Sequence, residues 1–281
     1  MKPLTFEEMP APANLQALRT LRRKPGAQIV LPPIAAEAKK VRVDAAHLRR
    51  YQRICGFAEQ DVLPLPYPQV TAAGLQMHVM TRAEFPLPLL GLVHLGNRIE
   101  QERPLEAQGS YTVTAGVENG RQTERGFEFE LYTRWRARDG EVWRAVATIL
   151  FRNRKPPERR KPPAEEAVGL SDYALLDAPG DIGRRYGRIA GDMNPIHLYP
   201  LTAKAFGFPR HIAHGMWSMA RCAALLEPSL GRPPRRLDTR FRQPLLLPAR
   251  AALRSRRAGE AMEFALLGRD SGKLHLNGSL G

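Results

Sequence analysis

Two long stretches of the chain repeat the same order of hydrophobic and polar patterns. Each begins with a mostly apolar run of helical length and continues with segments in which apolar and polar residues alternate. An apolar run of that length predicts a buried helix, and alternation predicts strands with one buried face. The repeat therefore predicts two similar units, each with one helix packed against antiparallel strands.

The first stretch starts with the apolar run at residues 70–86, where we expect one buried helix that ends before Pro86 and Pro88. Residues 90–153 alternate apolar and polar side chains, with turn signals at residues 118–120 and 139–140. These signals predict a meander of about four strands.

In the second stretch, residues 214–228 form the apolar run, and three alternating segments follow at 235–257, 260–270 and 273–281. A curved antiparallel sheet that wraps a helix buries most faces of that helix, which accounts for helices so poor in polar residues. The fold class that we predict is α+β, with two such units side by side.

The remaining segments set the domain boundaries. Residues 1–45 are rich in proline and charge and predict an N-terminal arm, and residues 153–169 have the composition of a linker. The two units are then expected at residues 46–152 and 170–281.

The net charge of +15 favours acidic or phosphorylated partners, such as an anionic cofactor or a carrier protein. The basic residues are dispersed, and there is no zinc finger or aromatic RNA-binding strand, so we expect no nucleic acid partner, although a basic nucleic-acid-binding protein is kept as a hypothesis. No apolar stretch is long enough to span a membrane, and the N-terminus lacks the pattern of a signal peptide, so we expect a cytoplasmic protein. Cys55 and Cys222 lie among apolar residues and are predicted to be buried, reduced thiols.

The stretch YGRIAGDMNPIHLYP, residues 186–200, places three polar side chains close together. Asn194 followed by Pro195 is typical of a helix N-cap and first helical residue, so His197 falls in the first turn and Asp192 just outside it. An ionised carboxylate and an imidazole near each other can hold a water molecule and move its proton.

His214 and Gly215 begin the apolar run that follows, at the point where a helix start leaves backbone N–H groups unpaired. Such donors can polarise a carbonyl group or stabilise an enolate. The pattern thus offers a proton-transfer pair and a place for developing negative charge.

Other interpretations of these residues remain open. The turn at 192–197 could be only a capping turn, and His197, His211 and His214 could hold a metal, but no carboxylate or thiolate stands at ligand spacing to His211 and His214, so we expect no metal. His78 and His94 lie in apolar runs and are predicted to be core histidines with satisfied hydrogen bonds.

Residues 186–220 resemble the signature of the MaoC-like (R)-specific enoyl-CoA hydratases and 3-hydroxyacyl-thioester dehydratases, G-D-x-N-P-x-H followed by an H-G-M helix start. The resemblance implies a hot-dog fold, here in its two-hot-dog form. It also implies that Asp192 and His197 activate water, that Asn194 orients them, and that the Gly215 N–H holds the thioester oxygen. The implied lyase reaction is the reversible hydration of trans-2-enoyl thioesters to (R)-3-hydroxyacyl thioesters, as in fatty acid metabolism.

The first unit departs from this signature, because its counterpart region at residues 56–70 offers Asp61 without a following Asn or His. We therefore expect one active site per chain, and the family resemblance implies that the degenerate unit makes room for the acyl chain.

The resemblance also bears on ligands and partners. It implies a substrate carried on coenzyme A or on the phosphopantetheine of an acyl carrier protein, no further cofactor, and a homodimer. His214, Met216 and Arg210 are possible substrate-binding residues, and His214 is also expected to pack against the helix or to cap it. The alternative is a non-catalytic hot-dog protein that binds acyl thioesters, because a fold alone does not carry an activity.

Overall fold

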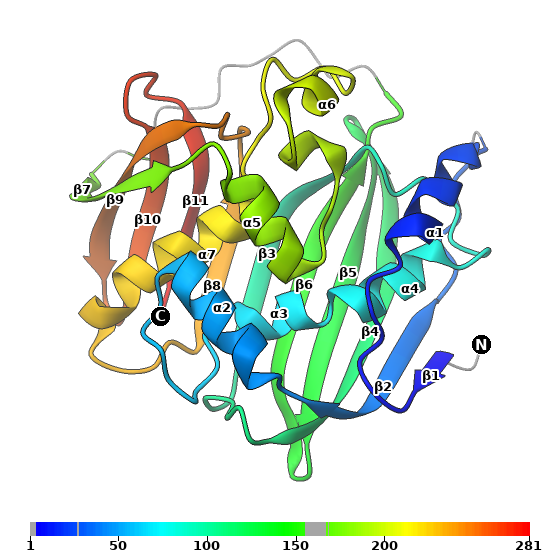
Figure 1. Cartoon of the computed structure of the whole chain (residues 1–281), viewed down its shortest axis with the longest axis horizontal. Coiled ribbons are helices and arrows are strands. Elements are labelled where there is room, and N and C mark those ends of the chain that lie inside the picture. The colour runs from blue at the N-terminus through cyan, green and yellow to red at the C-terminus, as the bar shows by residue number, and fades with distance from the viewer. Residues whose placement is uncertain (1–3, 27, 155–166, 168) are drawn as a thin grey trace.

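One curved sheet runs through both halves of the molecule in the computed structural model, which describes residues 4–26, 28–154, 167 and 169–281. In the described residues its 11 strands follow the spatial order β1-β2-β4-β5-β6-β3-β8-β11-β10-β9-β7 (Figure 1). The strands are β1 (Leu4–Phe6), β2 (Ala35–Arg42), β3 (Leu92–Gln101), β4 (Ser110–Thr123), β5 (Gly126–Ala137), β6 (Gly140–Phe151), β7 (Ser171–Ala178), β8 (Arg236–Phe241), β9 (Ala249–Ala258), β10 (Ala261–Gly268) and β11 (Leu274–Leu280).

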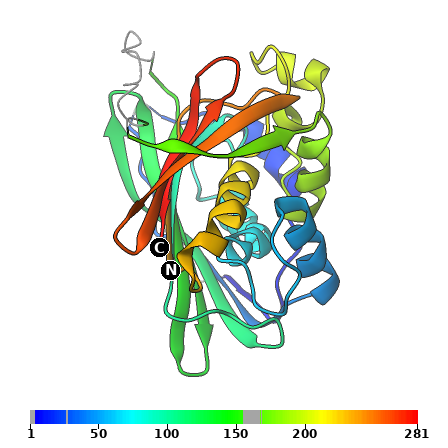
Figure 2. The same ribbon diagram turned by 90° about the vertical axis from the view of Figure 1, so that its left-hand side faces the viewer.

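The helices lie on the inner side of this sheet, and Figure 2 shows the sheet curling around them. They are α1 (Asn14–Arg19), η1 (Thr20–Arg22), α2 (Ala45–Cys55), α3 (Tyr67–Thr71), α4 (Ala73–Thr81), α5 (Ile182–Ala190), η3 (Pro195–His197), α6 (Pro200–Lys204), α7 (Gly215–Leu226) and η4 (Glu227–Leu230). Eight of the 12 residues of α7 are buried, so this helix lies in the core as its apolar composition predicts.

Both halves have the same topology. The order β2-β4-β5-β6-β3 in the first half matches β7-β9-β10-β11-β8 in the second, strand for strand along the chain. The sheet is continuous because β3 pairs antiparallel with β8, from Gly96 opposite Arg240 to Glu100 opposite Arg236. The predicted α+β architecture of two similar units, each with helices against an antiparallel sheet, is confirmed.

The halves are also joined through their helices. The Trp217 indole N–H on α7 donates to the Ile54 carbonyl at the end of α2 (3.0 Å), and the Arg221 guanidinium donates to the Cys55 carbonyl (2.9 Å). Cys55 and Cys222 are free and buried, as predicted, and burial raises the pKa of the Cys222 thiol to about 12.

The sheet of the first unit begins before residue 46, which we predicted as the start of that unit. Residues 35–42, which we assigned to an arm, form β2 and pair with β4. Ala36, Ala38 and Val41 are buried while the lysines between them are exposed, so the strand buries one face with small side chains that give a weak hydrophobic signal. Much of the expected linker, at 155–166 and 168, lies outside the described residues.

Two local predictions were wrong. The expected helix in residues 70–86 is two helices, α3 and α4, because Ala72 has a ψ of 1° and interrupts the helical backbone. The expected turn at 118–120 is a bulge inside β4, where Asn119 has a φ of 55°. The expected turn at Asp139 is present and joins β5 to β6. Strand β7 and helix α5 had no counterpart in the sequence prediction.

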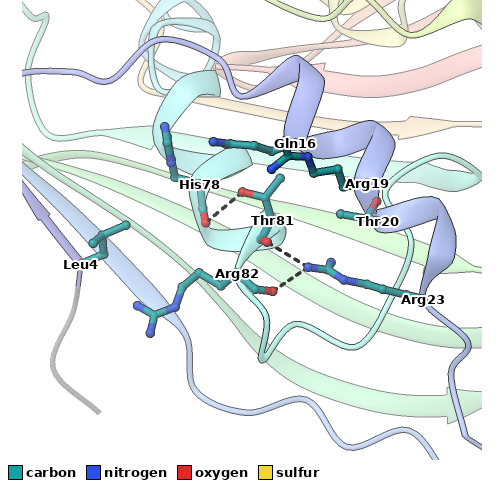
Figure 3. A pocket seen from close by; sticks show the side chains of 8 residues that line it. All are labelled: Leu4, Gln16, Arg19, Thr20, Arg23, His78, Thr81 and Arg82. Atoms are coloured by element: carbon teal, nitrogen blue, oxygen red, sulfur yellow. Dashed lines mark hydrogen bonds between the residues drawn. The ribbon is translucent and has the colours of Figure 1, made fainter.

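His78 is not a core histidine. It is half-buried on α4 and lines a surface cavity of about 370 Å³ with Arg19, Arg23 and Arg82 (Figure 3). The Arg23 guanidinium donates to the backbone carbonyls of Met80, Thr81, Arg82 and Leu87 at 2.6–3.0 Å, so it closes the C-terminal end of α4. Among the described residues, no helix has the length and apolar composition needed to cross a membrane.

Candidate active site

The turn after α5 has the predicted capping geometry. Gly191 ends α5 in the left-handed conformation with a φ of 70°. Asn194 is the N-cap of η3, its Oδ1 accepts from the Ile196 N–H (3.3 Å), and Pro195 is the first helical residue. The Asn194 N–H in turn donates to Asp192 Oδ1 (3.1 Å), which fixes the carboxylate at the mouth of the turn.

His197 is held by the neighbouring segment around Ile212. The Ile212 N–H donates to the Ile196 carbonyl (3.0 Å), and the Ile212 carbonyl lies 2.9 Å from His197 Nδ1. Because a backbone carbonyl only accepts, Nδ1 carries the proton in the neutral ring, and Nε2 has a free lone pair. This is the tautomer that a general base needs.

His214 brings Asp192 and His197 together. Its ring stacks on the His197 ring with centroids 3.7 Å apart, and its Nε2–H donates to the Asp192 carbonyl oxygen (3.1 Å). The same Nε2 is 3.7 Å from Asp192 Oδ2. His214 was expected to pack against or cap the helix or to bind substrate, and in the structure its ring packs on His197 and bonds to the Asp192 backbone.

The charges of this cluster suit proton transfer. Burial lowers the pKa of His214 to about 3 and lowers the pKa of His197, against the opposing effect of Asp192, so both rings are neutral at pH 7. Desolvation raises the pKa of Asp192, but His214, His197 and the Asn194 N–H outweigh it, and the net shift is downward. The Asp192 side chain is 51% exposed, so an ionised carboxylate faces the solvent beside two neutral imidazoles.

Two glycines of α5 allow the turn to lie close to the helix. A Cβ on Gly183 would stand 2.0 Å from the His197 carbonyl oxygen, and one on Gly187 would stand 2.7 Å from the Asp192 carbonyl oxygen. The i, i+4 spacing puts both glycines on one helix face. These two glycines were not among the predicted site residues, although their spacing just before the motif is visible in the sequence.

Gly215 begins α7, as predicted. The first hydrogen bond of the helix runs from the Ser218 N–H to the His214 carbonyl (3.1 Å). The N–H groups of the three preceding residues, Gly215, Met216 and Trp217, therefore have no acceptor within the helix. A Cβ on Gly215 would stand 2.9 Å from the Phe241 ring. The helix start therefore presents backbone donors next to the His214 ring.

The remaining candidates are Met216 and Arg210 for substrate and His211 for a metal, and they differ in their positions and contacts. Met216 lies at the site, where its sulfur is 3.2 Å from Asn97 Nδ2 of the first half, while Arg210 is exposed. His211 bonds instead to the Gly180 carbonyl (2.6 Å), so the histidine set considered for a metal is not the one that the fold assembles.

The side-chain ligand atoms of Asp192, His197 and His214 all lie within 4.8 Å of one another, a spacing that a divalent cation would also accept. In this cluster His197 Nδ1 is committed to Ile212 and His214 Nε2 to Asp192. His197 Nε2 and the carboxylate are the atoms with the clearest capacity to act on a ligand.

Comparison with known proteins identifies the family. Residues 160–276, which include the whole cluster, match the family model described as MaoC like domain. Over 257 residues the chain is 32% identical to 3-hydroxyacyl-thioester dehydratase X of Mycobacterium tuberculosis (strain ATCC 25618 / H37Rv), covering 89% of this chain and 90% of the relative. The chain belongs to the MaoC-like family. The resemblance found in the signature residues is confirmed.

Solved MaoC-like structures show the same fold. The crystal structure of HtdX of Mycobacterium tuberculosis superposes with a TM-score of 0.77 at 30% identity, over 88% of this chain and 98% of that one. A MaoC-like dehydratase from Phytophthora capsici superposes with a TM-score of 0.71 at 20% identity, over 89% and 94% of the two chains. The hot-dog fold that the signature implies is therefore present over most of the chain.

Proposed function

We propose that this MaoC-like protein catalyses the reversible addition of water to trans-2-enoyl thioesters, which yields (R)-3-hydroxyacyl thioesters. The observation that carries the proposal is the cluster of Asp192, His197 and His214 next to the start of α7. A carboxylate, a neutral imidazole with a free Nε2 and unpaired backbone donors are the groups that this reaction requires. The 3-hydroxyacyl-thioester dehydratase of M. tuberculosis, 32% identical, supports the same reaction class.

In hydration, a water molecule bound between Asp192 and His197 attacks C3 of the enoyl thioester. His197 Nε2 accepts the proton that this water loses, while the carboxylate orients the water and stabilises the resulting imidazolium. The electron pair of the C2–C3 double bond moves toward the thioester oxygen, which the Gly215 N–H meets. The enolate then takes at C2 the proton that the His197 imidazolium carries, which restores the neutral ring. Dehydration is the same path reversed, with Asn194 keeping Asp192 and η3 in place.

The remaining features of the proposal concern ligands and assembly. The acyl group is carried on coenzyme A or on an acyl carrier protein, with exposed Arg210 meeting a phosphate and Met216 contacting the thioester end. The first half, which lacks the signature, accommodates the acyl chain. The enzyme acts without a cofactor or metal, as a homodimer in the cytoplasm.

A hydration assay separates this proposal from a non-catalytic thioester-binding protein. The purified protein, mixed with crotonyl-CoA, is expected to remove the absorbance of the enoyl thioester and to give the (R)-3-hydroxy product by chiral chromatography. The rate should be unchanged after dialysis against a chelator. Binding of crotonyl-CoA without loss of absorbance would establish the non-catalytic alternative, and an (S) product would contradict the proposed stereochemistry.

A further inference from the structure

Among the described residues, three buried polar atoms without a hydrogen-bond partner lie on β3 and β8, the two strands that join the halves. They are Nε2 of His94, Oδ1 of Asn97 and Oγ1 of Thr239. Asn97 and Thr239 are directly opposite each other in the β3–β8 pairing, and they are 2% and 1% exposed. The expectation that His94 is a satisfied core histidine is therefore wrong.

A bulge in β3 places His94 and Asn97 on the same face of the sheet. In the pairing with β6 the register shifts between His94 and Gly96, so His94 stands opposite Ile149 and Asn97 stands opposite Ala147. Both partners are buried on the inner face. Regular alternation would put residues 94 and 97 on opposite faces, and the extra residue of the bulge re-aims His94 inward.

This inner face lies against the first turn of α7. Asn97 Nδ2 is 3.2 Å from the sulfur of Met216, the second residue of the helix. Next to it, the Phe241 ring lies against Gly215 and contacts the His94 ring, with centroids 4.9 Å apart. His94 and Asn97 of the first half's strand β3 thus connect to the first turn of α7, Asn97 through the Met216 sulfur and His94 through the Phe241 ring.

The Asn97 side chain lacks strong hydrogen-bond partners in this position. A thioether sulfur is a weak acceptor, so the bond to Met216 satisfies the amide poorly, and Asn97 Oδ1 has no partner. Burying polar groups without partners is costly, and an apolar side chain of similar shape would avoid that cost. The Asn97 N–H group, held only by this weak acceptor, is available to a stronger acceptor on a ligand during turnover.

We propose that the Asn97 amide, supplied by the half that lacks the catalytic signature, is a second hydrogen-bond donor to the thioester oxygen beside the Gly215 N–H. Negative charge develops on that oxygen in the transition state, and preorganised donors stabilise it more than they stabilise the ground state. The inference rests on the proposed hydration reaction and extends it, because the active site then spans both halves.

The test replaces the amide by an apolar group of similar size. Asn97→Leu is expected to lower kcat for crotonyl-CoA hydration by about 10²- to 10³-fold, the effect of losing one oxyanion donor, with little change in KM. Thr239→Val is the matched control, because it removes the neighbouring unpaired polar atom from the same buried pair, and its kcat should remain that of the wild type. Asn97→Asp, which keeps the shape but replaces the donor by an acceptor, should be as slow as Asn97→Leu.

Melting temperatures measured beside the rates separate catalysis from folding. Asn97→Leu should melt at or above the wild-type temperature, since it removes an unpaired buried group. A folded Asn97→Leu or Asn97→Asp with the wild-type kcat would overturn the inference, as would an equal loss of kcat in Thr239→Val. If the wild type itself does not hydrate the thioester, the proposed function fails and the role of Asn97 fails with it.

Discussion

The protonation state of His197 decides whether the cluster can act as a base. Nδ1 is committed to the Ile212 carbonyl, and burial lowers the pKa of the ring below its ordinary value of 6.5. A ring that stays neutral at pH 7 keeps a lone pair on Nε2 for the proton of the attacking water. Asp192 can remain ionised beside it, because its own pKa is shifted down and half of its side chain is open to solvent.

This state predicts the pH dependence of hydration. The rate should fall with decreasing pH as His197 gains a proton, and the acid limb should lie below pH 6.5, since the pKa of the folded state is lowered. A profile of kcat/KM between pH 4 and pH 8 with crotonyl-CoA measures this limb. An acid limb centred at or above pH 6.5 would contradict a buried, neutral His197.

At the level of residues, the sequence predicted the cap and the motif. The Asn194–Pro195 pair determines the local backbone through its own side chains, so its geometry is readable without tertiary information. The stacking of His214 on His197 joins residues that are brought together only by the fold, and periodicity carries no signal for it.

Among the elements, the packing of α5 on η3 sets the position of the pair. Gly183 and Gly187 let the helix approach the backbone of His197 and Asp192 more closely than any side chain would permit. The glycines therefore set the position of the Asp192 carboxylate and the His197 imidazole relative to α5.

Gly183→Ala tests this packing. The added methyl group would overlap the His197 carbonyl oxygen, so η3 must move, and a shift near 1 Å at a catalytic group costs about 10²-fold in rate. Overpacking should also destabilise the fold by about 1–3 kcal/mol. Gly180→Ala is the control, because in the described part of the chain its Cβ would have only Pro248 within 4 Å, at 3.9 Å. Rate and melting temperature are measured for both, and a fully active Gly183→Ala would refute the role of this contact.

Strand bulges explain two of the places where prediction from the sequence failed. The bulge in β4 took the place of a predicted turn, and the bulge in β3 turned His94 inward to a site that alternation assigns to Leu95. A bulge depends on how a strand pairs with its neighbours, so the alternation of a single strand does not reveal it.

In the whole molecule, the repeated order of elements produces two halves with the same strand order, and this much followed from hydrophobic patterning. Hydrophobic patterning did not predict how the two halves are joined. The β3–β8 pairing brings together residues about 140 positions apart, such as Asn97 and Thr239, and that juxtaposition places a residue of the half without the signature at the start of α7.

In the proposed reaction, Asp192 and His197 together activate water. The most direct test is the rate of crotonyl-CoA hydration by Asp192→Asn, which keeps the shape of the side chain and removes its charge, measured beside His197→Ala and the wild type. We expect kcat to fall by about 10²- to 10⁴-fold in each variant while the melting temperature shows a folded protein. A folded Asp192→Asn that hydrates crotonyl-CoA at the wild-type rate would contradict the account.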